Sequence, residues 1–106
     1  MLDDLIRQIG RDNLATVIDK VRAEAALRWD ELVAADTAAD TAALQRHVHS
    51  LASIFRSVGL VRAGDALKEI EITLRAGERP ATGWIEALEP LKSDSLSALQ
   101  QHLARL

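Results

Sequence analysis

Apolar side chains recur along this chain at alternating intervals of three and four residues. One stripe consists of Leu44, Val48, Leu51, Phe55 and Val58, and a second, after Gly59, of Leu60, Ala63, Leu67, Ile70 and Leu74. Because an α-helix has about 3.6 residues per turn, this spacing places each set on one helix face. No long segment alternates apolar with polar residues as a half-buried β-strand does. The sequence therefore predicts an all-α fold.

Capping and helix-breaking residues give the expected limits of the first half. We expect a short helix over residues 2–9 that ends at Gly10, and a long helix that Asp12 or Asn13 caps and that reaches about residue 35. The apolar side of this long helix includes Leu14, Val17, Ile18, Val21, Ala25 and Leu32.

The second half is divided in the same way. A helix over residues 41–58 can be capped by Thr37 or Asp40 and ends at Gly59, and the next helix closes at Gly77 and Pro80. These limits predict long amphipathic helices joined by short connections.

The last segment carries two apolar stripes shifted by one position: Trp84, Leu88 and Leu91, then Leu96, Leu99, Leu103 and Leu106. We expect one helix kinked near Pro90, with a break at Ser93–Asp94 as the alternative. The expected architecture is an antiparallel four-helix bundle with a short additional N-terminal helix, in a single domain over residues 1–106.

Length and composition limit the classes of function. The chain has 106 residues, no cysteine and no apolar run of the roughly 20 residues that cross a bilayer. With no secretory signal in MLDDLIRQIG, we expect a cytoplasmic protein without membrane attachment. A formal net charge of −3 argues against nucleic acid as a partner, because phosphate binding favours a basic face.

A row of polar and small side chains runs beside the central stripe: Gln45, His49, Ala52, Ser53 and Arg56. This composition indicates a boundary face, so His49 should be supported by packing and open to solvent. A neutral imidazole is a competent nitrogen nucleophile, and small neighbours would let a partner approach closely. His49 is therefore the candidate reactive residue.

The stretch VHSLASIFRSVGLVRAGDALKEIE, residues 48–71, resembles the signature of histidine-containing phosphotransfer (HPt) domains. That signature reads roughly A-H-x-L-K-G-x-x-x-x-x-G, followed by a helix that ends in a glutamate. His49, Leu51, Gly59 and Glu71 fall at the family spacing, and Val48 fills the apolar place before the histidine. The order of helices resembles the family over essentially the whole chain.

This resemblance implies a phosphorelay intermediate rather than an autonomous enzyme. His49, through Nε2, would take a phosphoryl group from the aspartyl phosphate of one response-regulator receiver domain and pass it to another. Magnesium would belong to the receiver, so no cofactor is expected in this chain. Expected partners are receiver domains and a hybrid histidine kinase, with the chain itself a monomer. Gln45, Ala52, Ser53 and Arg56 would form part of the docking surface.

The chain departs from the signature at Ala52 and Ser53, where the family usually has Lys and Gly. The lysine would lean toward the histidine and offset phosphoryl charge. Arg56 and Arg46, each about one or two turns from His49, are candidate substitutes, with Ser53 as a further supporting residue. The alternative for both arginines is an ordinary solvated charge.

Rival interpretations follow from the same residues. The missing lysine favours a non-catalytic module that docks on a receiver or kinase without carrying phosphate, and a purely structural bundle is a third option. The pair His47 and His49 cannot readily share a metal ion, because residues two apart on a helix point about 200° away from each other. A helix-turn-helix reading around Gly59 is opposed by Asp65, Glu69 and Glu71, whose charges would repel DNA.

Overall fold

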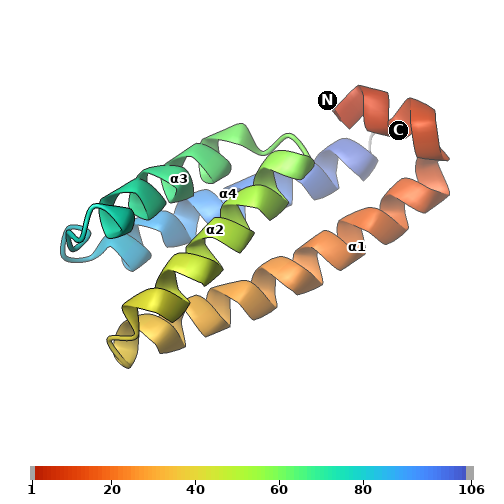
Figure 1. Cartoon of the computed structure of the whole chain (residues 1–106). Coiled ribbons are helices and arrows are strands. Elements are labelled where there is room, and N and C mark those ends of the chain that lie inside the picture. The colour runs from red at the N-terminus through yellow and green to blue at the C-terminus, as the bar shows by residue number, and fades with distance from the viewer. Residues whose placement is uncertain (1, 105–106) are drawn as a thin grey trace.

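The computed structural model describes the backbone of residues 2–104 and the side chains of residues 13 and 15–101. Over this range the chain forms four helices, α1 (Leu2–Thr37), α2 (Thr41–Ser57), α3 (Val61–Arg75) and α4 (Trp84–Ala104), and no strand. Figure 1 shows them packed side by side as an antiparallel bundle. The predicted all-α four-helix bundle is confirmed.

The separate N-terminal helix predicted over residues 2–9 is not formed. Helix α1 runs without interruption through Gly10, although Figure 1 shows its first turns directed away from the axis of the rest. Glycine adopts right-handed helical dihedrals as readily as the left-handed ones that end a helix, and inside a helix it costs only about 1 kcal/mol relative to alanine. A glycine alone therefore does not stop a helix. The side chains of Asp12 and Leu14 lie outside the described residues.

The connections follow the predicted capping chemistry. Asp40 caps α2, its carboxylate accepting a hydrogen bond from the backbone N–H of Ala43 at 3.1 Å. Gly59, between α2 and α3, has a φ of 81°, a left-handed conformation that glycine adopts without strain. These two residues fix the turns at either end of α2.

The core lies where the stripes of the helices meet. Phe55, Val48 and Leu51 of α2 have no exposed surface, and α2 packs against both α1 and α3. Trp29, Leu32 and Ala25 of α1 pack into the same cluster, as do Ala63, Leu67 and Leu74 of α3. Helix α2 is thus held on two sides, which fixes the direction in which its remaining face points.

Helix α4 is continuous through Pro90 and through Ser93–Asp94, so the alternative break is absent. Leu99 is buried, and Trp84, Leu88, Leu91 and Leu96 are partly buried against the core. The side chains of Leu103 and Leu106 lie outside the described residues. None of the helices, as far as their residues are described, is long and apolar enough to cross a membrane.

Candidate functional site

Helix α2 presents His49 at the edge of the buried stripe. Val48, the preceding residue, is fully buried, whereas the side chain of His49 keeps 55% of its surface exposed. A residue adjacent to a core position on a helix lies about 100° away from it, so His49 faces the boundary with solvent. The predicted exposure of this imidazole is confirmed.

Helix α3 supplies the partner of the imidazole. The Nδ1 atom of His49 lies 2.8 Å from Oε2 of Glu71, at hydrogen-bonding distance. Glu71 is the buried charged residue of the described core, with 1% of its surface exposed. The exposed histidine is thus attached through one ring nitrogen to a carboxylate between the helices.

Small residues bring α2 and α3 close enough for this contact. Gly64 of α3 is buried, and a Cβ atom at this position would lie 3.3 Å from the carbonyl oxygen of Ala52 and 2.6 Å from Cγ of Arg56. Ala52 itself is buried, with 4% exposed. The prediction that Ala52 belongs to an exposed row is therefore wrong: it is part of the buried core, and its carbonyl oxygen lies close to Gly64 of α3.

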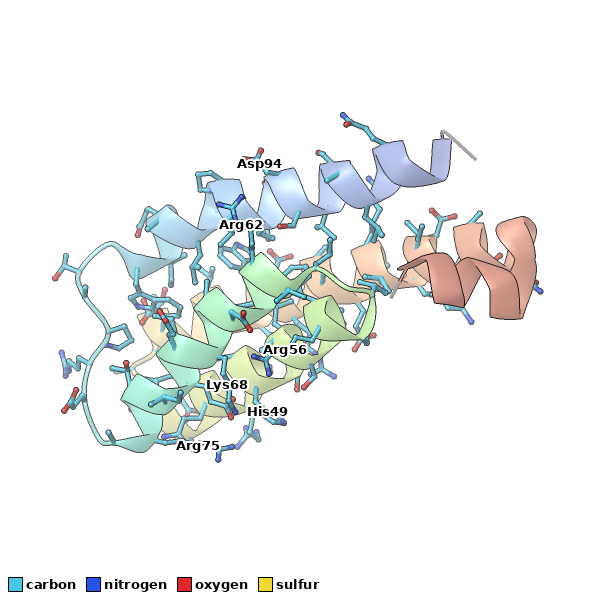
Figure 2. All side chains as sticks on the ribbon, turned by 90° about the horizontal axis from the view of Figure 1, so that it is seen from above. His49, Arg56, Arg62, Lys68, Arg75 and Asp94 are labelled. Atoms are coloured by element: carbon cyan, nitrogen blue, oxygen red, sulfur yellow. The ribbon has the colours of Figure 1, made fainter. Side chains whose placement is uncertain are left out.

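Two cations of α3 share the carboxylate with His49. Lys68 places Nζ 3.2 Å from Oε1 of Glu71, and Arg75 places a guanidinium nitrogen 2.7 Å from Oε2. Their positions three before and four after Glu71 put all three side chains on one helix face. Figure 2 shows Lys68 and Arg75 gathered near His49 along the junction of α2 and α3. We call His49, Lys68, Glu71 and Arg75 the histidine cluster.

The charge state of Glu71 follows from opposing effects. Burial raises the pKa of its carboxyl, but hydrogen bonds from Lys68 and His49, together with the charge of His49 when protonated and the charge of Arg75, lower the pKa more, so that it lies below the ordinary value. Glu71 is therefore an anion at neutral pH.

An anionic Glu71 determines the tautomer of His49. A carboxylate has no proton and can only accept a hydrogen bond, so the proton of the neutral imidazole must be on Nδ1. The second ring nitrogen, Nε2, then carries the free lone pair. The cluster holds the ring in the tautomer that makes Nε2 a nucleophile.

Two of the side chains predicted beside His49 bind other groups. Arg56 binds the carboxylate of Asp65 at 2.5 Å, about two turns along α2 from His49, so it does not lean toward the imidazole as expected. Gln45 donates to the carbonyl oxygen of Leu74 at 3.2 Å, near the end of α3. Arg46 and Ser53 are exposed, and Arg46 makes no ion pair with any described residue.

The second histidine of α2 belongs to another interface. Nδ1 of His47 lies 3.1 Å from Oε2 of Glu31 on α1, in an orientation that makes no hydrogen bond, and 18% of its side chain is exposed. His47 and His49 thus face carboxylates of different helices. Among the described residues no group of three or more His, Cys, Asp or Glu side chains could hold a metal ion.

The burial of Glu71 could have been predicted from the sequence, although the apolar periodicity alone does not indicate it. Ile70 was assigned to the buried stripe, yet it is only half buried, and Glu71 takes the core position four after Leu67 and three before Leu74. An acid at a core position, with cations three before and four after it, indicates a buried carboxylate that a nearby group must satisfy. Lys68 and Arg75 could have been found in the same way.

Comparison with known families agrees with this arrangement. The family model described as the Hpt domain matches residues 5–106. No curated protein and no solved structure gave a significant match. Because the family match covers nearly the whole chain, this protein belongs to the Hpt domain family, the phosphotransfer modules of two-component phosphorelays.

Proposed function

We propose that this chain carries a phosphoryl group on Nε2 of His49, taken from the aspartyl phosphate of one receiver domain and delivered to the aspartate of another. The observation that carries the proposal is the 2.8 Å contact of Nδ1 with the buried carboxylate of Glu71, on a ring that is 55% exposed. One nitrogen is held by the protein, and the other remains for a visiting phosphoryl group.

The transfer step balances with the groups at hand. The lone pair of Nε2 attacks the phosphorus of the acyl phosphate, the new N–P bond forms, and the bond from phosphorus to the aspartyl oxygen breaks. The aspartate leaves as a carboxylate with the electron pair. No proton needs to move, since Nδ1 keeps its hydrogen and donates it to Glu71. Transfer to the second receiver is the reverse reaction.

Glu71 supports this step through charge as well as tautomer. Attack by Nε2 gives the ring a positive charge, because both nitrogens are then substituted. The carboxylate 2.8 Å from Nδ1 stabilises that charge as it develops. Glu71 is thus a positioning residue that acts through His49, and His49 is the residue that contacts the phosphoryl group.

The surroundings of His49 suit a protein donor. Cavities of about 500 Å³ and 380 Å³ lie beside the α3–α4 loop and between the start of α3 and α4, and His49 lines neither. A donor would therefore reach the ring on an open helix surface, and the donor would supply the enclosing walls. Ser53 and the half-buried Gln45 remain proposed docking residues, and Ile72, 58% exposed on α3 beside Glu71, adds an apolar contact.

The proposal is tested by incubating the protein with receiver domains charged by acetyl phosphate. The unmodified chain should acquire an acid-labile label, and His49→Gln should acquire none while keeping its helical circular dichroism. His47→Gln is the matched control, two residues away on the same helix, and should label normally. Labelling retained in His49→Gln would refute the assignment.

The same assay separates the alternative of a binding module. The buried alanine at position 52, where the family usually has lysine, favours a chain that docks without carrying phosphate. Such a module would bind receivers, for example in a titration calorimeter, and never acquire label. Binding without labelling of the unmodified chain would therefore replace the phosphotransfer proposal with this one.

A further inference from the structure

A phosphoryl group on His49 would need positive charge near it, and neither position 52 nor Arg56 provides it. A phosphoryl group carries between one and two negative charges at neutral pH. Position 52 holds a buried alanine, and the guanidinium of Arg56 is bound to Asp65. The nearest cations that the structure ties to the ring through a shared partner are instead on α3.

We propose that Lys68 and Arg75, which flank Glu71 on α3, hold the phosphoryl group on His49 and replace the lysine that α2 lacks. This inference rests on the proposed function. Both cations bind the oxygens of Glu71, and the same carboxylate binds Nδ1 of His49. Three contacts of 2.7–3.2 Å to one carboxylate confine the three nitrogen groups to a common neighbourhood.

The heads of both cations can reach a group outside the protein. The side chain of Lys68 is 40% exposed and that of Arg75 is 62% exposed, although their common partner is buried. Each side chain has several N–H donors and uses one nitrogen on Glu71. Both can therefore keep the carboxylate and still donate to a phosphoryl oxygen on Nε2.

The charge count of the cluster agrees with this role. With a neutral imidazole, two cations face one anion, so the cluster carries one excess positive charge before phosphorylation. In the family signature a lysine on α2 supplies the positive charge, whereas in this chain the excess positive charge lies on α3. A bidentate guanidinium and a compact ammonium both bind phosphate well, so the pair suits a phosphoryl group held from two sides.

The first test measures how phosphoryl groups distribute at equilibrium between a receiver and this chain. Replacing both residues, Lys68→Ala with Arg75→Ala, should lower the share on His49 roughly tenfold, the combined effect of two charge-assisted contacts that solvent weakens. Lys68→Arg keeps the charge and should restore most of the share lost in Lys68→Ala. The matched control is Arg62→Ala, which removes one cation from the start of α3, where Figure 2 shows it near Asp94.

A second test needs no receiver, and so separates this inference from the proposed function. Phosphoramidate, a small phosphoryl donor, can label histidine directly, and the ³¹P signal of His49 is the one missing in His49→Gln. The two cations should lower the pKa of that phosphoryl group, so the double variant should show a higher value than the unmodified chain. The ¹⁵N shifts of His49 in the unphosphorylated protein report whether its tautomer has changed.

The outcomes distinguish the possibilities. An altered ³¹P titration with unchanged ¹⁵N shifts supports direct contact of the cations with the phosphoryl group. Identical titrations of the double variant and the unmodified chain overturn the inference, even where receivers label His49 normally. Failure of receivers to label His49, with an altered ³¹P titration, overturns the proposed function and leaves the cation site in place.

Discussion

The substitution Glu71→Gln removes one charge from the histidine cluster and changes its shape least. The amide has the size of the carboxylate and can still accept or donate one hydrogen bond at each end. It loses the charge that Lys68 and Arg75 neutralise. It also loses the strict acceptor character that places the proton of His49 on Nδ1. The change thus tests the electrostatic role of Glu71 and its control of the tautomer together.

The expected loss of stability follows from the contacts. A hydrogen bond to a charged group contributes about 1.5–3 kcal/mol and a neutral one about 0.5–1.5 kcal/mol. Lys68 and Arg75, at 3.2 and 2.7 Å from the carboxylate, are 40% and 62% exposed. Solvent screening therefore reduces the difference between a charged and a neutral hydrogen bond for each of them. The neutral side chain also avoids the free-energy cost of burying a charge, which offsets part of the loss. We expect a net loss of about 1 kcal/mol, or roughly 4–8 °C in Tm for a domain of this size.

The pH dependence of this loss has a definite sign. Because the pKa of Glu71 is lower in the folded chain than in the unfolded one, the unfolded chain binds more protons in acid. The contribution of Glu71 is therefore fully present above the ordinary carboxyl value of 4.5 and is lost as the pH falls through the lowered value. The difference in unfolding free energy between the unmodified chain and Glu71→Gln should be constant near neutral pH and shrink in acid.

Urea denaturation followed by circular dichroism, from pH 7 down to pH 3, measures this difference. Two-dimensional ¹⁵N NMR of His49 measures the tautomer, which should lose its Nδ1–H preference in the variant. Phosphotransfer should slow roughly tenfold, the effect of about 1.4 kcal/mol in the transition state. A variant with the same tautomer and a pH-independent stability difference would falsify the role assigned to Glu71.

Other substitutions test the packing and the surface contacts. Arg56→Ala should lower the free energy of unfolding by less than about 1 kcal/mol, because its ion pair is exposed, and should leave the phosphotransfer rate within about twofold. A large loss of rate would show that Arg56 contributes to the site. Gly64→Val should destabilise the chain by about 1–3 kcal/mol in thermal unfolding, because its side chain meets the backbone of Ala52, and an unchanged Tm would contradict that close approach. Asp40→Ala should cost about 1 kcal/mol in urea unfolding through loss of the α2 cap, whereas Asp40→Asn should be nearly neutral.

The fold was largely predictable because its signals are local. The spacing of Val48, Leu51 and Phe55 depends only on the helical period, and Asp40 caps the helix that follows it. Gly10 was misjudged because glycine permits a stop and does not impose one. A helix ends at a glycine only where the chain also changes direction, and tertiary packing determines whether it does.

The site was only partly predictable because its contacts join different helices. His49 could be found from its spacing in one helix, whereas its bond to Glu71 spans 22 positions in the sequence. Arg56 was assigned toward the histidine because side chains lean toward the N-terminus of a helix. Arg56 binds Asp65 on α3 instead, a contact between two helices that rules for a single helix do not predict.

The central claim is that Nε2 of His49 accepts the phosphoryl group. The most direct measurement is NMR of the protein phosphorylated by a charged receiver, in which coupling between ³¹P and the ring protons identifies the bonded nitrogen. The account predicts a single phosphohistidine, with phosphorus on Nε2 of His49 and the proton still on Nδ1. Phosphorus on His47, or on Nδ1 of His49, would contradict it.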